Sequence, residues 1–127
     1  MNKKDIIDIV KAKNYPENEY WVTVGAGLVM HGVRAEAGDV DMGCTTSLAE
    51  SLIQNGAKWQ FLKDGTRRIE DGDTIELFEN WLVDEIVLMD GVSVASVQSI
   101  RKQKVLLNRE KDWKDIGLID AFVAKGQ

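Results

Sequence analysis

One stretch, residues 21–42, constrains the fold more than any other part of the chain. It opens with residues 21–24, which are rich in β-branched and aromatic side chains and predict a short buried strand. Gly25-Ala26-Gly27 follows, and glycine permits a tight turn that other residues resist. The next apolar run, residues 28–33, is too short to span a membrane and fits a buried helix of two turns.

The same stretch ends with two aspartates, Asp39 and Asp41, in a strand-like run. Because side chains alternate faces along a strand, both carboxylates point to one side, roughly 6.6 Å apart along the chain. Like charges on one face repel unless a cation lies between them, and Mg²⁺ prefers carboxylate oxygens together with substrate phosphates. The glycine turn would leave backbone N–H groups free for an anion at the helix N-terminus. The pattern therefore favours metal-assisted phosphoryl or nucleotidyl transfer.

The order strand, Gly-Ala-Gly, short helix with His31-Gly32, Arg34, then Gly38-Asp-Val-Asp41 resembles the nucleotidyltransferases related to DNA polymerase beta. It is most similar to their small bacterial branch, which holds minimal nucleotidyltransferases, antibiotic-modifying enzymes and abortive-infection toxins. That branch has a hydrophobic residue, Gly, then Gly or Ser, and Asp-x-Asp about a dozen residues later. A third acid follows on a later strand. Val24-Gly25-Ala26 fills the first part, with Ala26 in place of the Gly or Ser.

The resemblance implies an activity and a set of site residues. The enzyme would move a nucleoside monophosphate from an NTP, such as ATP, to a hydroxyl of an antibiotic, an RNA or a protein. The expected catalytic residues, which would also hold Mg²⁺ or Mn²⁺, are Asp39, Asp41 and Glu76. The expected nucleotide-binding residues are Gly25, Ala26, Lys104 and Arg109.

Glu76 and the two cations also have plainer interpretations. Glu76 alternates with apolar neighbours in a strand, and the alternative interpretation is a solvent-facing glutamate on an edge strand within an acidic region. Lys104 and Arg109 belong to a Lys, apolar stretch, Arg-x-Lys-Asp pattern that the family often shows between its last two helices. The alternative is that Lys104 belongs to a solvated helix face and that Lys111-Asp112 caps the final helix.

Composition and length set further bounds. The 127 residues fit a single domain over residues 1–127. A net charge of −5 argues against general DNA binding, which requires a basic face. A single cysteine, Cys44, and the absence of a signal peptide or an apolar run of membrane-spanning length predict a cytoplasmic protein without membrane association. We expect Cys44 to be a small buried residue, and His31 to pack with one hydrogen bond.

The rest of the chain predicts a mixed β-sheet flanked by helices, an α/β or α+β arrangement that fits the nucleotidyltransferase fold. Hydrophobic periodicity and turn signals place helices at residues 4–13, 45–54, 96–107 and 110–124. They place strands at residues 58–62, 67–70, 74–78, 81–89 and 92–95, with a hairpin turn at Asp64-Gly65.

A competing hypothesis is a non-catalytic nucleotide-binding or partner-binding protein that keeps the same fold. Ala26 and a glutamate at position 76, where the family more often has aspartate, are the departures that favour it. The chain also has no room for a separate substrate domain. An acceptor would therefore bind in a shallow cleft or with a second subunit, either a helical protein partner or a second copy in a homodimer.

Overall fold

The computed structural model describes residues 1–126. This part of the chain forms five α-helices, one short 3₁₀-helix and seven β-strands. The helices are α1 (Lys3–Lys13), η1 (Glu17–Glu19), α2 (Val24–Met30), α3 (Thr46–Gln54), α4 (Val97–Leu107) and α5 (Glu110–Lys125). The strands are β1 (Tyr20–Val22), β2 (Val40–Cys44), β3 (Lys58–Phe61), β4 (Arg67–Glu70), β5 (Ile75–Glu79), β6 (Ile86–Met89) and β7 (Val92–Ala95).

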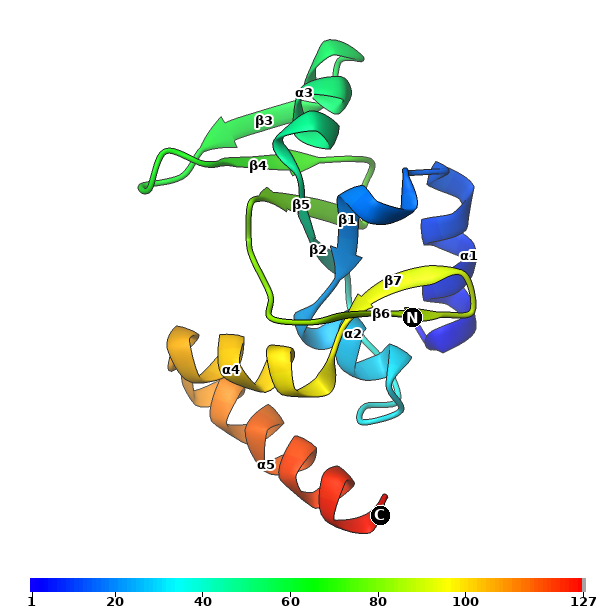
Figure 1. Ribbon diagram of the computed structural model, residues 1–127, viewed down its shortest axis with the longest axis vertical. Coiled ribbons are helices and arrows are strands. Elements are labelled where there is room, and N and C mark those ends of the chain that lie inside the picture. Colours follow the sequence, from blue (N-terminus) through cyan, green and yellow to red (C-terminus); the bar gives the residue numbers. More distant parts are fainter. Residues whose placement is uncertain (127) are drawn as a thin grey trace.

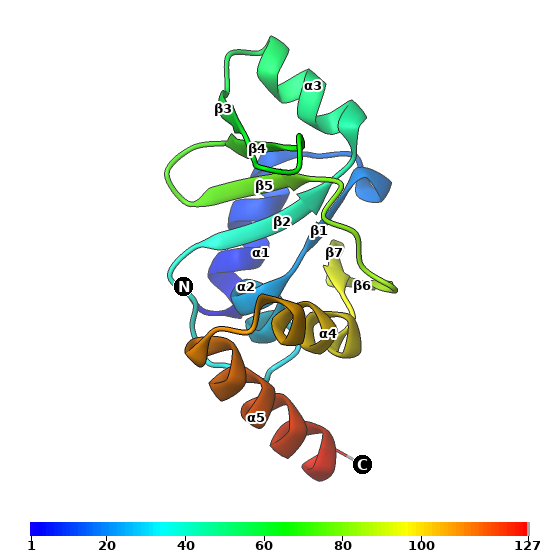
Figure 2. The ribbon, with the colours of Figure 1, turned by 90° about the vertical axis from the view of Figure 1, so that its left-hand side faces the viewer.

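The strands form one mixed sheet in the order β3-β4-β5-β2-β1-β7-β6 (Figure 1). Two neighbouring pairs, β2 with β5 and β1 with β7, are parallel, and the other four pairs are antiparallel. In both views α3 lies at one end of the molecule and the α4–α5 pair lies at the other (Figures 1 and 2). The predicted class, a mixed sheet flanked by helices, is therefore confirmed.

Short polar caps fix most helix ends where the sequence places them. Asn2 accepts a hydrogen bond from the backbone N–H of Asp5, whose side chain accepts one in return from Asn2, so α1 begins with a capping box. Thr45 and Ser96 accept from the N–H groups three residues ahead and begin α3 and α4. Asn14 and Asn108 adopt left-handed conformations and end α1 and α4.

The alternation along β2 separates the core from the candidate site. Val40 and Met42 are fully buried and pack with residues of α1, α2 and α3, whereas Asp39 and Asp41 point to the opposite face. In Figure 2 α1 lies behind the sheet. A second small cluster, built from Leu28, Ile100 and Ile119, joins α2 to α4 and α5. This cluster places the α4–α5 pair beside the amino end of β2.

The predicted glycine turn in residues 21–42 is wrong in its details. The strand ends at Val22, and α2 already begins at Val24, so Gly25 and Gly27 lie within the helix. The left-handed backbone at the start of α2 belongs to Val24 (φ 44°) and not to Gly25 or Gly27, and the glycine of this stretch with a positive φ is Gly32 (φ 82°), after the helix. At Gly27 a Cβ would lie 2.7 Å from Cδ1 of Ile100, so a larger residue there would force that buried side chain to shift.

The predicted strand at residues 81–89 is also too long, because only β6 (Ile86–Met89) is extended. The chain has to leave β5 inside the sheet and reach β6 at its edge, so the preceding residues form a connecting loop. Trp81 in this loop accepts a hydrogen bond at its carbonyl oxygen from Nε1 of Trp21 (2.9 Å). The hairpin at Asp64-Gly65 is confirmed, with β3 and β4 antiparallel and Gly65 at φ 86°.

Within residues 1–126, no helix combines the length and the apolar character needed to cross a membrane.

Candidate active site

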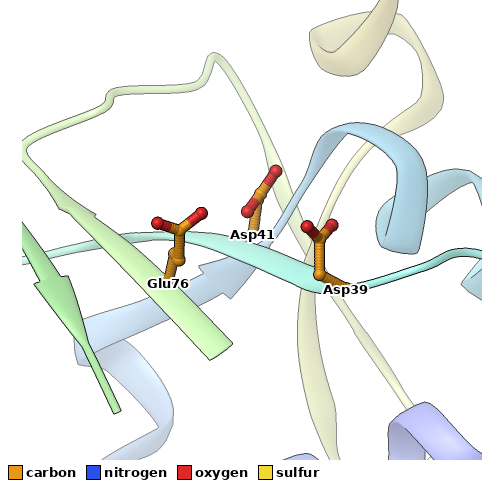
Figure 3. Close-up of side chains that lie close together, drawn as sticks. All are labelled: Asp39, Asp41 and Glu76. Atoms are coloured by element: carbon orange, nitrogen blue, oxygen red, sulfur yellow. The ribbon is translucent and has the colours of Figure 1, made fainter. Parts of the chain in front are cut away.

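Three acidic side chains meet on the face of the sheet opposite the core. Asp39 directly precedes β2, Asp41 lies within it, and Glu76 stands beside Asp41 in the parallel pairing of β2 with β5. One carboxylate oxygen from each residue lies within 4.8 Å of the other two. Figure 3 shows the three carboxyl groups pointing the same way from the two strands. The predicted common face of Asp39 and Asp41 is confirmed, and Glu76 joins them.

Asp41 is partly buried beside two other acids, and its carboxylate is held in an unfavourable environment. Burial, followed by the charges of Asp39 and Glu76, raises the pKa of Asp41 to about 6, and the cations Lys111 and Arg109 counteract only part of this rise. Its buried Oδ1 atom has no hydrogen-bond partner among the described residues. A buried acceptor without a partner is costly, so this oxygen is available to a ligand.

The cluster suits a hard divalent cation. Mg²⁺ and Mn²⁺ bind carboxylate oxygens, and opposite ligands of Mg²⁺ stand about 4.2 Å apart, twice a bond of about 2.1 Å. The separations between the three oxygens are at most 4.8 Å, so no more than small side-chain rotations would be needed to close the site around such an ion. Glu76 is partly compensated by Arg68, whose Nη1 lies 3.2 Å from Oε2 of Glu76. Neither Asp39 nor Asp41 forms a salt bridge within the described chain.

A basic cavity of about 500 Å³ opens beside the two aspartates. Its wall contains Gly25 from α2, Gly38 and Asp39 from the segment before β2, and Asp41 itself. Five cations from the α2–β2 loop, α4 and α5 also line it: Arg34, Lys104, Arg109, Lys111 and Lys114. We call this space the basic cavity.

Two of the predicted nucleotide-binding residues, Lys104 and Arg109, are engaged in an internal network. Lys104 is only 4% exposed, and its Nζ lies 3.3 Å from Oδ1 of Asp112 and 2.8 Å from Oδ2 of Asp115. Arg109 forms two hydrogen bonds with the carboxylate of Asp112, at 2.6 and 3.1 Å. Arg34 approaches Asp115 at 3.5 Å from the other side. The interpretation of Lys104 as part of a solvated helix face is therefore wrong.

Asp112 makes this network part of the fold. It is fully buried, and its Oδ2 accepts the backbone N–H of Arg109 (3.2 Å) at the start of α5, so the predicted capping role is confirmed. Burial pushes the pKa of Asp112 upward, but hydrogen bonds from Arg109 and Lys104 outweigh it and hold the pKa below its ordinary value. Arg109 remains an exposed residue and reaches the wall of the basic cavity, so it connects the network to the site.

The other two predicted nucleotide-binding residues differ in their access to the site. Gly25 borders the basic cavity, and a Cβ there would lie 3.1 Å from Nη1 of Arg34. Ala26 is 1% exposed and its side chain packs in the core, so only its backbone remains available for a phosphate contact. Val24 borders the cavity with its left-handed backbone, which for a β-branched residue stores on the order of 1–3 kcal/mol of strain.

A second cavity of about 370 Å³ lies on the other side of Asp41. Its wall combines the apolar side chains of Leu62, Phe78, Trp81 and Leu107 with polar ones, among them Asp64, Thr66, Glu79 and Asn80. The rings of Phe78 and Trp81 pack edge to face, with centroids 5.0 Å apart and an interplanar angle of 64°. Val24, Asp41 and Arg109 line both this space, which we call the aromatic cavity, and the basic cavity.

Sequence reasoning did not identify several residues of the site. Lys111 and Lys114 line the basic cavity and form no salt bridge within the described residues, so their charges remain available. The sequence offers a weak indication of this role. The two lysines are three residues apart in a predicted helix, which places them on one helix face, and Asp112 lies between them in the sequence. His31 and Cys44 are placed as expected: Nε2 of His31 lies 2.8 Å from the carbonyl oxygen of Ala95, and Cys44 is fully buried.

Comparison of the sequence with protein-family models and with curated proteins finds no match. The assignment to the nucleotidyltransferases therefore rests on the motif and on the geometry of the site, and we treat it as a proposal.

Proposed function

We propose that this chain is a metal-dependent nucleotidyltransferase related to the DNA polymerase beta superfamily. The observation that carries the proposal is the convergence of Asp39, Asp41 and Glu76, with one buried oxygen of Asp41 left unpartnered. Structural acids in this protein are compensated, as Asp112 shows, whereas these three acids face one another. An arrangement that costs stability and serves no packing role favours a ligand site.

The surroundings of the acids favour a polyphosphate substrate. A divalent cation bound to the three acids would neutralise phosphate charge and support attack by a hydroxyl. Lys111, Lys114 and Arg109 line the adjoining cavity and would attract the triphosphate, because their charges oppose those of the phosphates. Because Gly25 has no side chain, a phosphate in the basic cavity could approach the backbone of α2 closely.

The reaction then needs few further groups. The acceptor oxygen forms a bond to the α-phosphorus, the bond from this phosphorus to the bridging oxygen breaks, and pyrophosphate leaves with the negative charge. The proton of the hydroxyl passes to Glu76 or to water. Glu76 lies beside Asp41 and is partly exposed, so it is the residue of this chain best placed to receive it.

Transfer of label tests the proposal. The protein is incubated with each α-³²P-labelled NTP, Mg²⁺ and candidate acceptors in the three classes named above, and the labelled products are separated. We expect label on an acceptor only when Mg²⁺ or Mn²⁺ is present. A parallel thermal-shift series should show stabilisation by NTP with Mg²⁺ and none with EDTA, because phosphates beside Asp39 and Asp41 are repelled without a cation. Equal shifts in both series would mean that the nucleotide binds elsewhere.

One observation favours a second candidate, a non-catalytic nucleotide-binding protein. Lys104 is fully engaged with Asp112 and Asp115, so fewer cations are free for the phosphates than the motif implies. Metal-dependent NTP binding without label transfer to any acceptor would support this candidate over the enzyme.

A further inference from the structure

The aromatic cavity and the basic cavity lie on opposite sides of Asp41 along the direction of β2. The basic cavity includes Gly38 and Asp39, which precede the strand. The aromatic cavity includes Phe78 and Trp81, which lie at and beyond the carboxyl end of β5. Because β5 runs parallel to β2, this end of β5 corresponds to the carboxyl end of β2. Asp41 therefore stands at the junction between a space lined by cations and one lined by an aromatic pair.

Phosphoryl transfer places the attacking oxygen and the leaving oxygen on roughly opposite sides of the phosphorus. With the α-phosphate beside Asp41, the leaving pyrophosphate belongs in the basic cavity, which five cations line. The attacking hydroxyl must then come from the opposite side. We propose that the aromatic cavity is the acceptor site of this enzyme and takes a small molecule that carries a hydroxyl on an apolar ring or on a short arm from it. This inference rests on the proposed nucleotidyltransferase function.

The lining of the aromatic cavity defines the class of acceptor. The edge-to-face pair of Phe78 and Trp81 offers ring surface, and Leu62 and Leu107 add aliphatic surface. The volume of about 370 Å³ falls within the range of small-molecule sites. Such a lining fits a ring better than a flexible polar chain.

The charges in the aromatic cavity disfavour a phosphorylated acceptor. Asp64 lies in its wall and accepts hydrogen bonds from the backbone N–H (3.0 Å) and the hydroxyl (2.6 Å) of Thr66. Glu79 is also in the wall, but its carboxylate is neutralised by Arg67 at 2.8 and 2.9 Å. Asp41 and Arg109 also line the cavity. Because Arg109 pairs with Asp112 at 2.6 and 3.1 Å, the carboxylates of Asp41 and Asp64 set the charge at this side and repel phosphate groups. An RNA end is therefore a poorer fit than an uncharged ring alcohol.

Indole NMR signals offer a direct test in the full chain. The Nε1–H of Trp21 donates to the carbonyl oxygen of Trp81, so the Trp21 and Trp81 signals both report on the aromatic cavity. Trp59 and Trp113 line neither cavity and serve as internal controls. With 2-phenylethanol as probe, we expect saturable shifts of the Trp21 and Trp81 signals alone. Its matched phosphate ester, 2-phenylethyl phosphate, should bind about tenfold more weakly or not at all. Equal shifts at all four tryptophans, or none at Trp21 and Trp81, would overturn the proposal.

Variants make the test specific. Trp81→Ala removes one ring of the aromatic pair but keeps the backbone carbonyl that accepts the hydrogen bond from Trp21. It should weaken the binding of 2-phenylethanol, measured from the Trp21 signal, about tenfold. Leu107→Ala, at a partly exposed helix end, gives a second variant that leaves the core untouched and should also weaken binding. The matched control is Trp59→Ala, which removes a half-exposed tryptophan on β3 and should leave probe binding within twofold. Unchanged binding in both cavity variants would overturn the proposal.

A final titration separates the acceptor from the nucleobase as the occupant. The probe is titrated with and without Mg²⁺ and saturating α,β-methylene NTP, which cannot release pyrophosphate. An acceptor site predicts that nucleotide and probe bind together. Displacement of the probe by the nucleotide would assign the cavity to the nucleobase and overturn the acceptor role. If no NTP analogue binds, the proposed function fails and the acceptor role fails with it, whereas probe shifts at Trp21 would still establish a ring-binding cavity.

Discussion

Two groups of charged residues lie side by side in this protein, and they are built in opposite ways. In the network at the start of α5, Lys104 and Arg109 surround the buried Asp112, and each charge meets an opposite charge within hydrogen-bond distance. In the acidic cluster on β2 and β5, Asp39 and Asp41 face each other and Glu76 without such partners.

The contrast distinguishes charges that stabilise the fold from charges that fit a ligand site. A buried carboxylate that belongs to the fold has a pKa held below its ordinary value, as Asp112 does. A carboxylate whose pKa is raised by burial and like charges, as that of Asp41 is, weakens the fold at neutral pH unless a cation binds. The two groups share Arg109, which pairs with Asp112 and lines the basic cavity. The structural network therefore positions a cation next to the acidic cluster.

The largest expected effect concerns turnover. If Glu76 is the proton acceptor or a metal ligand, Glu76→Gln should lower the rate of label transfer by about two to four orders of magnitude. The fold and most of the Mg²⁺-dependent NTP stabilisation should persist, because the change is nearly isosteric and both aspartates remain. Rates of transfer and thermal shifts are measured on the same preparations.

Glu70→Gln is the matched control for Glu76→Gln. Glu70 stands opposite Glu76 in the antiparallel pairing of β4 with β5, and both approach Arg68, at 3.7 and 3.2 Å. Glu70 does not belong to the acidic cluster, so its substitution should leave turnover nearly unchanged. Equal losses in the two variants would show that only the general charge of this face matters.

The next effect concerns the compensated network. Lys104→Met removes a buried cation and leaves Asp112 and Asp115 with Arg109 and Arg34 alone. Breaking a buried ion pair from one side should lower the free energy of unfolding by about 2–4 kcal/mol, measured by urea denaturation. Lys102→Met, on the same helix, removes an exposed cation paired with Asp84 and should leave the urea midpoint unchanged. A Lys104→Met protein as stable as wild type would contradict the structural role of the network.

The smallest of these effects concerns Asp41 without metal. The pKa of Asp41 rises from 3.8 to about 6 on folding, so the native state holds this proton more tightly than the unfolded state. The contribution of Asp41 to stability is therefore greatest below about 3.8 and is lost as the pH rises through about 6. In EDTA at pH 8, Asp41→Asn should raise the free energy of unfolding by about 1–2 kcal/mol, with allowance for solvent screening.

The control for this prediction is to compare the two proteins at a series of pH values. The advantage of Asp41→Asn over wild type should shrink steadily as urea denaturation is repeated from pH 8 down to pH 4. Saturating Mg²⁺ should reverse the order of the two proteins at pH 8, because only wild type keeps the full set of ligand oxygens. A variant less stable than wild type in EDTA at pH 8 would show that Asp41 is compensated after all.

Local patterns predicted much of the fold and the centre of the site. The spacing of Asp39 and Asp41 fixed their common face, since alternation along a strand is a local property. The same local pattern could not predict that Glu76 lies next to Asp41. This contact depends on the pairing of β2 with β5, which are more than thirty residues apart in the chain. Only the resemblance to a known family placed Glu76 with the aspartates.

Other features depend on packing that no local pattern encodes. Lys104 looks like a solvated lysine in the sequence, and it is buried only because α5 brings Asp112 and Asp115 against it. The backbone of Val24 adopts a left-handed conformation that its β-branched side chain disfavours. Residue propensities therefore predicted the turn at the glycines that follow, and not at Val24. The aromatic cavity is built from the β3–β4 turn, the end of β5 and the end of α4, which meet only in the folded chain.

The central claim is that the uncompensated acids hold a divalent cation, and Mn²⁺ binding followed by electron paramagnetic resonance tests it most directly. Free Mn²⁺ gives a sharp signal that is lost on binding. We expect wild type to bind Mn²⁺, Mg²⁺ to compete for the same site, and Asp39→Asn/Asp41→Asn to lose at least about tenfold in affinity. The matched control, Asp8→Asn/Glu17→Gln, removes the same charge from exposed positions and should bind as wild type does. Equal Mn²⁺ binding by wild type and by Asp39→Asn/Asp41→Asn would contradict the account.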